Sequence, residues 1–233
     1  MATMFEQLMN LPLLRGVSQT RMSAIVGNTK LHFLKYPAQE TLVRAGDPCS
    51  HLTFILSGSV RMTAVNASGR FVVGQTLKAP AVLSPDFLFG RHTSYPSTVV
   101  AIDDVSVLKI AKQDYTHLLA SDPVFLFNYI NMVAANAQKS VEGIMSLTTG
   151  EIDERIAFWI SALTQPGSTD IVLTCRKRDL CSLFGVPRGV FEAGLKSMKE
   201  RGLIDYTNHE FSVIDRQSLL ALLEQNHEEE NDK

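Results

Sequence analysis

One segment constrains the fold more than any other part of the chain: residues 176–204, which read RKRDLCSLFGVPRGVFEAGLKSMKERGLI. Apolar residues recur at helical spacing on both sides of Gly185, and glycine most readily accepts the left-handed backbone of a tight turn. Pro187 follows at the start of the second helical pattern, where its missing N–H removes no hydrogen bond. The segment therefore predicts two short helices joined by a tight turn, a helix-turn-helix.

The outward face of this segment is basic, although the formal net charge of the whole chain is −2. A local excess of Lys and Arg on one small motif is typical of a DNA reader, whereas a near-neutral chain is not typical of a protein that coats nucleic acid. An ordinary helical hairpin with a solvated charged face stays open as an alternative, because such patterns recur by chance. The basic residues are Arg176, Lys177, Arg178, Arg188, Lys196, Lys199 and Arg201.

The residues around the motif complete the pattern of a winged helix. A hairpin, the wing, is expected in residues 203–213 around Asn208 and His209. A helix is expected at 151–163 and a short strand at 170–174, ahead of the motif, and a last helix follows the hairpin.

Residues 30–111 have a different character, with short runs of β-branched and aromatic residues such as HLTFILSG and SVRMTAV separated by turn signals. Many short strands at this spacing predict a β-sandwich or barrel. Ahead of them, residues 3–30 have helical spacing, with Ser18 as the expected N-cap. The chain therefore predicts a β-rich N-terminal half and a helical C-terminal half.

A long helix is predicted from Asp122 to about Leu147. Apolar and small residues recur in it at alternating spacings of three and four, the heptad seam of two packed helices. A second set, Leu126, Tyr129 and Val133, is expected to pack on the β-rich domain. Two apolar faces favour a helix–helix homodimer, with burial of one broad face in the chain's own core as the alternative. The predicted seam consists of Phe127, Ile130, Ala134, Ala137, Val141 and Ile144.

Several classes of protein are excluded by what the sequence lacks. Cys49, Cys175 and Cys181 are scattered, so neither a zinc site nor a four-cysteine iron–sulfur cluster is expected, and a reducing cytoplasm is favoured. No apolar run is long enough to cross a membrane, and the start carries Glu6 and no basic leader, so no signal peptide is expected. A cupin-type enzyme would need a His-x-His for its metal. Neither that motif nor a nucleophile–base pair occurs, so the chain is expected not to be an enzyme.

A β-roll, a long dimerising helix and a winged helix-turn-helix, in this order, resemble the Crp/Fnr family of bacterial transcription regulators. The run VRAGDPCSHLTFILSGSVRM is similar to the family's strands and glycine turns, FLFGR resembles the start of its phosphate-binding cassette, and Arg155-Ile156-Ala157 matches its signature after the long helix. The resemblance implies an α+β fold with an N-terminal double-stranded β-helix (jelly-roll or β-roll) in residues 1–121. It implies a dimerisation helix and hinge in residues 122–149 and a winged helix-turn-helix DNA-binding domain in residues 150–233.

The resemblance also implies an effector pocket at the cassette, but the residues depart from those of members that bind cyclic AMP. Arg91 stands where those members have the Glu that holds the ribose, and Tyr95 and Pro96 stand at the position of the Arg-Ser pair that binds the cyclic phosphate. A phosphate site without its Arg loses a charge-assisted contact. The chain is therefore predicted not to bind cyclic AMP tightly. The implied pocket residues are Phe89, Gly90, Arg91, His92, Ser97, Thr98 and Ser140.

Two other accounts of the pocket stay open. Haem needs an axial His, Cys or Met, and His92 beside Arg91 is the one pair expected at the pocket mouth, although a solvated loop histidine is the simpler interpretation. A vestigial pocket without any ligand would make the protein a constitutive DNA-binding regulator. The remaining candidate haem ligands are scattered along the chain: His32, His51, Met62 and Met145.

In the family, the start of the motif's second helix reads the half-site from the major groove. Arg188 keeps the first reading position and is the best candidate for a bidentate contact to guanine. Gly189 replaces the family's Glu, so the base that this Glu contacts is either not recognised or recognised through DNA shape. The target is therefore predicted to differ from a TGTGA-type half-site. Glu192 is either an acceptor for a cytosine amine or a solubilising residue. Phosphate contacts, which set affinity rather than sequence, are expected from Thr174, Arg176, Lys177, Arg178, Ser182 and Lys196.

The expected partners follow from the same resemblance. A two-fold homodimer places two recognition helices about one DNA turn, ~34 Å, apart and calls for a palindromic double-stranded site. RNA polymerase and an unknown small-molecule effector are the further expected partners, with no membrane, and the expected location is cytoplasmic. Effector binding would be signalled through the long helix to a hinge at Thr148 to Gly150.

Overall fold

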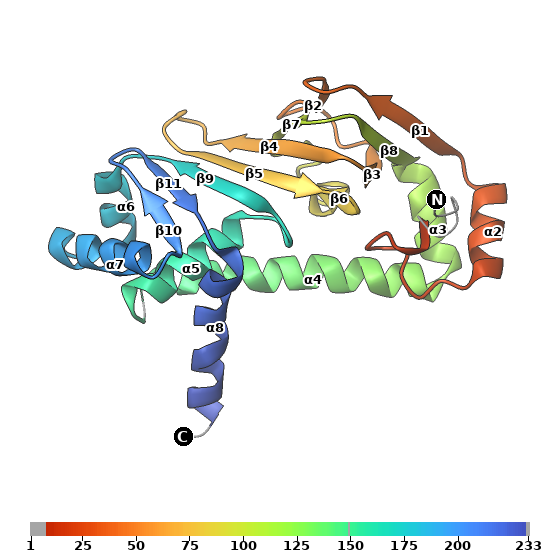
Figure 1. The fold of residues 1–233 in the computed structure, drawn as a ribbon. Coiled ribbons are helices and arrows are strands. Elements are labelled where there is room, and N and C mark those ends of the chain that lie inside the picture. Colours follow the sequence, from red (N-terminus) through yellow and green to blue (C-terminus); the bar gives the residue numbers. More distant parts are fainter. Residues whose placement is uncertain (1–7, 149, 232–233) are drawn as a thin grey trace. The chain divides into compact units, whose positions relative to one another are not determined.

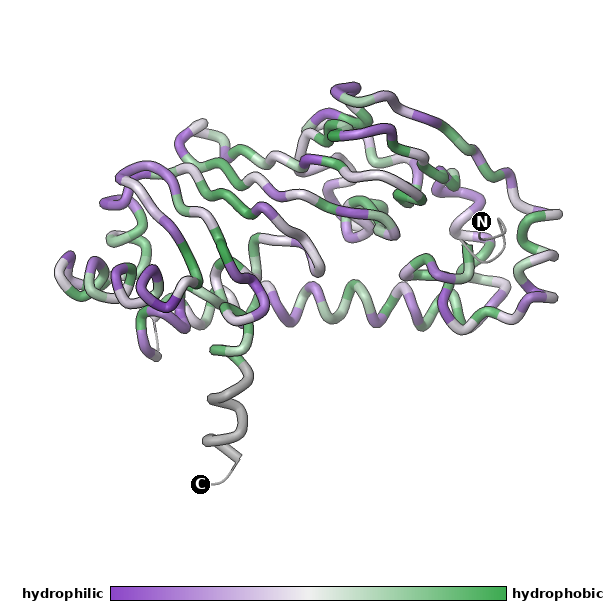
Figure 2. Tube along the Cα trace, viewed as in Figure 1, coloured by the Kyte–Doolittle hydropathy of each residue, from purple (hydrophilic) through white to green (hydrophobic). Residues whose placement is uncertain are grey.

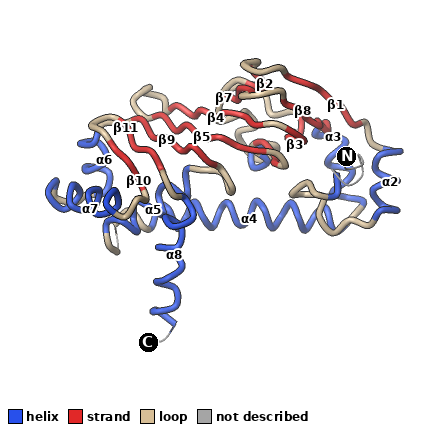
Figure 3. The backbone as a smooth tube through the Cα atoms, viewed as in Figure 1, coloured by secondary structure: helices blue, strands red, loops and turns tan. Residues whose placement is uncertain are grey.

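Figure 1 shows the computed structural model, which describes residues 8–148 and 150–231. They form two compact units. The first contains the residues up to 62 together with 77–136, and the second contains 63–76 together with the residues from 137 onward. Figure 3 shows the strands of the β-roll and of the wing in red and the helices in blue. The antiparallel β-roll, the long helix and the C-terminal helical region with its wing confirm the predicted fold class.

Strands β3 and β8 are the central strands of one sheet of the β-roll in the first unit. They are neighbours in a sheet of order β1-β8-β3-β6, in which Leu108 lies opposite both Phe33 and Phe54. Leu108 and Phe54 are fully buried, which is why these strands read as nearly continuous apolar runs. The elements are β1 (Leu31–Tyr36), β2 (Thr41–Val43), β3 (His51–Ser57), β4 (Ser59–Val65), β5 (Val72–Lys78), β6 (Ala81–Leu83), η1 (Pro85–Phe87), β7 (Thr98–Ala101), β8 (Val105–Ala111) and α3 (Lys112–Ser121).

The N-terminal helix is shorter than predicted. Helix α2 spans Gln19–Asn28, and the Ser18 side chain accepts a hydrogen bond from the Arg21 N–H, which confirms the predicted N-cap. The prediction of helical structure over residues 3–30 is wrong for residues 12–16, which form turns that end at Gly16 with φ +78°, and residues 3–7 lie outside the described residues. Three leucines in or next to these turns are all buried: Leu11, Leu13 and Leu14. In a helix, residues this close in the sequence would point in different directions, and one face could not bury all three.

Helix α4 (Pro123–Met145) begins in the first unit and ends in the second. Phe125 and Tyr129, one turn apart, are buried in the core of the first unit. Leu126 is 38% exposed, so the prediction that it packs on the β-rich domain is wrong, and Phe125 takes that place. Figure 2 shows apolar and polar residues alternating along this helix. All six residues of the predicted seam are exposed: Phe127, Ile130, Ala134, Ala137, Val141 and Ile144.

The second unit contains the winged helix. Helix α6 ends at Gly185, whose φ is +62°, and α7 begins at Arg188, which confirms the predicted helix-turn-helix. Strand β11 pairs antiparallel with β10 and β9, which confirms the predicted wing. Trp159, Phe184 and Phe191 fill the core between the helices. The elements are α5 (Ile152–Leu163), β9 (Thr169–Thr174), α6 (Lys177–Phe184), α7 (Arg188–Glu200), β10 (Ile204–Tyr206), β11 (Glu210–Val213) and α8 (Arg216–Asn231).

Two segments of the second unit lie before residue 150, where the winged-helix domain was predicted to begin. The hairpin tip, residues 63–76, is included because β5 pairs antiparallel with β9 and because Phe71 packs on Trp159, with ring centroids 5.4 Å apart. The last turns of α4 are included because α4 crosses α5 closely: a Cβ on Gly143 would clash with the Ala162 Cβ. The compact units therefore divide the chain at other places than residues 121 and 149. Thr149 of the predicted hinge lies outside the described residues.

Candidate nucleic-acid interface and effector cassette

The turn between α6 and α7 sets the start of the candidate reading helix. Gly185 closes α6 in the left-handed conformation, which a residue with a Cβ adopts only under strain. The Cys181 Sγ–H donates to the Val186 carbonyl at 3.2 Å, so the small side chain on α6 also holds the turn. Arg188 then begins α7 directly beside α6.

A buried arginine supports the same turn from the interior. Arg155 is 6% exposed, and its Nη2 donates to the carbonyl groups of Leu147 and Phe184. Its guanidinium lies 5.7 Å from the centroid of the Phe184 ring. Carbonyl groups at helix ends have no partner within the helix. One side chain therefore connects the segment that follows α4 to the end of α6.

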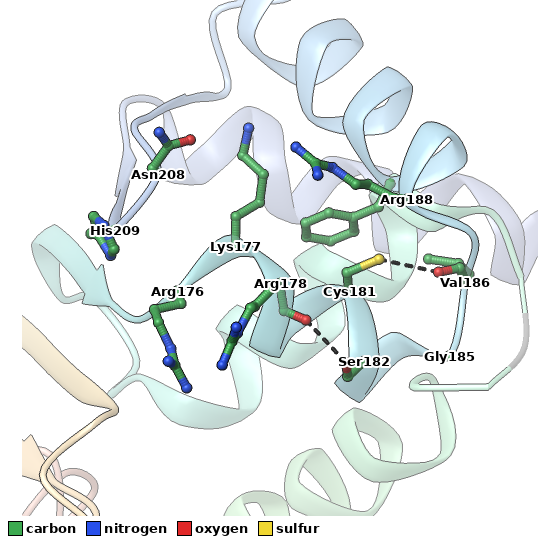
Figure 4. A pocket seen from close by; sticks show the side chains of 11 residues that line it. Arg176, Lys177, Arg178, Cys181, Ser182, Gly185, Val186, Arg188, Asn208 and His209 are labelled. Carbon is green, nitrogen blue, oxygen red and sulfur yellow. Dashed lines mark hydrogen bonds between the residues drawn. The ribbon is translucent and has the colours of Figure 1, made fainter.

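A hollow of about 620 Å³ lies between α6, the start of α7 and the wing (Figure 4). Four cationic side chains line it and no carboxylate does, so it concentrates positive potential where a polyanion would bind. Asn208 and His209 of the wing also line it. The sequence places both at the hairpin tip, but its pattern does not assign them to DNA. The lining residues are Arg176, Lys177, Arg178, Cys181, Ser182, Gly185, Val186, Arg188, Phe191, Asn208 and His209.

Arg188, the predicted reader of guanine, is 83% exposed in its side chain. Its Nε donates to the Glu192 Oε1 at 3.0 Å, one turn along α7. The Lys177 Nζ lies 3.9 Å from the same carboxylate oxygen. A Cβ on Gly189 would meet nothing within 4 Å. Arg188 is thus open to a ligand, whereas the Glu192 carboxylate is shared between two cations.

Some of the residues predicted to contact phosphate line the hollow, and others lie outside it. The Arg176 guanidinium donates to both carboxylate oxygens of Asp179, at 2.8 and 3.2 Å, and these hydrogen bonds hold the pKa of Asp179 below its ordinary value. Arg178, 76% exposed in its side chain, contacts the same carboxylate at 3.4 Å. Arg176, Arg178 and Ser182 line the hollow. The predicted DNA contacts that lie outside its lining are Thr174, Gly189, Glu192 and Lys196.

In the cassette, an aromatic side chain occupies the position at which the family's phosphate-binding arginine was expected. Tyr95 is 5% exposed, and its hydroxyl lies 3.4 Å from the Thr53 Oγ1 and from the His51 carbonyl oxygen, to which it donates. Burial raises the pKa of Tyr95 to about 12. Its backbone is held as well, because its N–H donates to the Asp47 carbonyl and its carbonyl accepts from the Gly46 N–H, both at 2.9 Å. The phenol is therefore a fixed part of the roll.

The predicted pocket residues lie in different environments. Arg91 and His92 are exposed, and Gly90 between them and η1 has φ +96°. Ser97 is buried, and the Thr98 hydroxyl accepts from the Ala45 N–H at 3.1 Å. Phe89 packs edge-on against Tyr129 with ring centroids 5.6 Å apart, and the Lys112 ammonium lies 4.9 Å from its ring centroid. Ser140 lies on α4, away from these loop residues in the sequence.

The part of the chain that the structure describes contains no group of three or more His, Cys, Asp or Glu side chains that could hold a metal ion. The rings of His32 and His51 lie edge-on, 6.2 Å apart. Burial raises the pKa of Cys175 to about 12, so this thiol stays protonated at neutral pH. Among the described helices none alone is long and apolar enough to cross a membrane; α3 and α4 meet that test only as a pair, which is bent by 114°.

Comparison with known proteins agrees with this architecture. Residues 33–122 match the cyclic nucleotide-binding domain family. The chain is 22% identical over 183 residues to the cAMP-activated global transcriptional regulator CRP of Haemophilus influenzae, covering 76% of this chain and 81% of that one. It is 25% identical to the regulator Vfr of Pseudomonas aeruginosa, covering 74% and 85%. The Thermus thermophilus catabolite activator protein has the same fold, with a TM-score of 0.50 at 19% identity over 89% of this chain and 96% of that one.

The fold, the basic helix-turn-helix and these relatives point to the same assignment. The β-roll coincides with the matched domain, and the curated relatives extend over most of the chain. An enzyme is not part of this assignment, because the relatives are transcription regulators. The β-roll therefore matches the cyclic nucleotide-binding domain family, and over most of its length the chain is similar to DNA-binding transcription regulators of the Crp type.

Proposed function

We propose that this protein acts as a homodimer that reads a palindromic DNA site through Arg188 and does not require cyclic AMP. The observation that carries the proposal is the contrast between an open, cationic hollow on the winged helix and a cassette in which Tyr95 is buried. The cytoplasm and RNA polymerase, as location and further partner, belong to the same proposal.

The base contact is supported by the exposure of Arg188 at the first position of α7. A guanidinium there has the reach and the paired donors for the O6 and N7 atoms of guanine. Gly189 and Ala193 offer no polar side chain to their bases, which favours a half-site unlike TGTGA. The Asn208 and His209 side chains at the hollow add polar contacts from the wing to the DNA backbone.

The homodimer is supported by the exposed seam of α4. Phe127 is 61%, Val141 59% and Ile144 67% exposed. Large apolar side chains at heptad spacing on one helix match a second copy of the same helix, because a two-fold interface uses one patch twice. The alanines in the middle, Ala134 and Ala137, allow a close helix approach. A second copy of this chain is therefore the proposed occupant of the seam.

The relatives CRP and Vfr are described as cAMP-activated, but the chemistry of this cassette favours another effector or none. A cyclic phosphate needs a charge-assisted partner. Tyr95 offers a neutral phenol that is already committed to Thr53 and to the His51 carbonyl. The exposed Arg91 supplies a cation at the position of the family's ribose-binding Glu. An unidentified effector that is not cyclic AMP is the first candidate, and a vestigial pocket is the second, favoured by the burial of Tyr95.

The experiment is selection of binding sites from random double-stranded DNA by the purified protein, with and without small molecules extracted from cells. We expect a palindrome with half-sites about one turn, ~34 Å, apart. Arg188→Ala should cost about 1–3 kcal/mol and relax one base position in each half-site. Selection of an unchanged site by Arg188→Ala would refute the base contact. A palindrome selected only with the extract would favour a gated regulator, and one selected in both cases a vestigial pocket.

A further inference from the structure

Arg188 is connected through charged and aromatic contacts to the wing. Its Nε donates to the Glu192 Oε1, and the same oxygen lies 3.9 Å from the Lys177 Nζ. The Lys177 ammonium also lies 4.9 Å from the centroid of the Tyr206 ring on β10. These four side chains come from α7, α6 and the wing. We call them the reading network: Arg188, Glu192, Lys177 and Tyr206.

The pair on α7 would be weak by itself. Its two members are 83% and 40% exposed in their side chains, so water screens their attraction. The basic residue also precedes the acidic one, which is the less favourable order for a pair one turn apart on a helix. A third group is therefore needed to hold the Glu192 carboxylate in one place, and the Lys177 ammonium is the group that the structure provides.

Lys177 is itself fixed. Its side chain is 20% exposed, and its backbone N–H donates to the Asn208 carbonyl of the wing at 3.1 Å. Lys199, bonded to Asp205, shares the Tyr206 ring at 5.6 Å from its centroid, so the ring faces positive charge from α7 as well as from α6. Although Lys177 lines the hollow, its ammonium already contacts a ring and a carboxylate, and these contacts compete with a DNA phosphate for it.

We propose that Lys177 and Glu192 are positioning residues for base recognition, and that they keep the Arg188 guanidinium in the orientation that reads guanine. The inference rests on the proposed base contact of Arg188. It replaces the two roles that the sequence suggests for these residues, a phosphate contact for Lys177 and a cytosine acceptor for Glu192. Positioning predicts a loss of discrimination, because an unrestrained arginine pays about 0.5–1.5 kcal/mol to become ordered on the DNA, which corresponds to roughly two- to twelvefold.

The test measures two quantities on the selected palindrome: the affinity ratio between the site with guanine and the site with that base pair changed, and the slope of log K against log salt concentration. Lys177→Ala should lower the ratio roughly two- to twelvefold and leave the slope unchanged. Arg178→Ala is the matched control, since Arg178 neighbours Lys177 and its side chain is 76% exposed. It should leave the ratio unchanged and reduce the slope by about 0.9 for each phosphate that is no longer neutralised.

The carboxylate is tested in the same way. Glu192→Gln should lower the affinity ratio between the guanine site and the changed site, as Lys177→Ala does. Lys177→Arg keeps a cation at the carboxylate and should therefore retain much of the ratio of the unchanged protein. Thermal unfolding of each variant separates a folding defect from a recognition defect, because a misfolded winged helix loses affinity for every sequence alike. A double variant, Lys177→Ala with Arg188→Ala, should discriminate no worse than Arg188→Ala alone, since positioning acts only through Arg188.

The outcomes separate this inference from the proposed function. If Arg188→Ala changes nothing, the base contact itself fails. If Arg188→Ala relaxes one base position while Lys177→Ala leaves the ratio intact and lowers the salt slope, Lys177 is a phosphate contact and the positioning role is overturned. If Glu192→Gln instead relaxes a different base pair from the one that depends on Arg188, Glu192 reads that base directly, and the inference is equally overturned.

Discussion

The helix-turn-helix surface and the cassette of the β-roll are the two places where the resemblance to the Crp/Fnr family predicts a ligand. Their polar groups differ in exposure and in charge. On α6 and α7, cationic side chains stay exposed around a hollow, with Arg188 free to contact a ligand. In the cassette, the fixed group is a buried phenol, Tyr95, whose hydroxyl and backbone are bonded within the roll. The comparison teaches that one chain can present an exposed cationic surface at one candidate site and a buried, neutral group at the other.

The strongest test on the DNA side concerns the dimer, without which no palindrome is read. Ala137→Glu places two carboxylates at the centre of the seam, where they would be buried without partners, and should destabilise the dimer by about 3–5 kcal/mol. Sedimentation velocity over a concentration series measures the shift to monomer. Gln138→Glu, an equal charge at an exposed position of α4 outside the seam, is the control. A dimer that tolerates Ala137→Glu would show that the seam is not the interface.

The next test concerns the support of the reading helix. Arg155→Ala leaves the Leu147 and Phe184 carbonyl groups without their partner and opens space beside the Phe184 ring. We expect a loss of about 3 kcal/mol in the free energy of unfolding of the second unit, since hydrogen bonds to a charged group contribute about 1.5–3 kcal/mol each. Thermal unfolding measures it, with Arg178→Ala as an exposed arginine control. Equal melting temperatures would mean that Arg155 does not hold the turn.

A smaller effect is expected in the cassette. Tyr95→Phe removes a hydroxyl whose contacts are 3.4 Å long, so the loss at neutral pH should be about 1 kcal/mol or less. Calorimetry should still detect no tight binding of cyclic AMP, because no cation is gained. Micromolar binding by either form would contradict the account of the cassette.

The pH dependence of Tyr95 has a defined sign. Burial raises the pKa of Tyr95 to about 12, above the ordinary value of about 10 for an unfolded tyrosine. The unfolded state therefore loses its proton first, and the stability contributed by the neutral phenol is full below pH 10 and is lost between pH 10 and pH 12. Tyr129, with a pKa also raised to about 12 by burial, adds to this loss. Tyr95→Phe should flatten the alkaline decline, measured by denaturant unfolding at a series of pH values.

Local patterns predicted much of this molecule. Gly185 and Pro187 mark the helix-turn-helix because turn chemistry depends on neighbours in the chain. The seam of α4 follows from helical periodicity alone. The resemblance also aligned Tyr95 with the missing arginine, but the hydrogen bonds that fix the Tyr95 backbone join it to Gly46 and Asp47, about fifty residues away in the chain.

What the sequence could not predict depends on contacts between distant segments. The pairing of β5 with β9 joins residues about a hundred positions apart, and nothing in either strand specifies that partner. The contact of Lys177 with Glu192 and Tyr206 depends on how α6, α7 and the wing pack. The interruption of the N-terminal helix follows from tertiary burial of closely spaced leucines, which overrides their helical spacing.

The most direct test of the contrast between the two sites is to titrate the selected palindrome with the purified protein in the presence and absence of saturating cyclic AMP. The account predicts the same dissociation constant in both conditions, because the hollow around Arg188 is open and the Tyr95 phenol is buried where the resemblance predicts the phosphate-binding arginine. DNA binding that appears only with cyclic AMP would contradict it, since the cassette would then hold a cyclic phosphate despite the buried phenol.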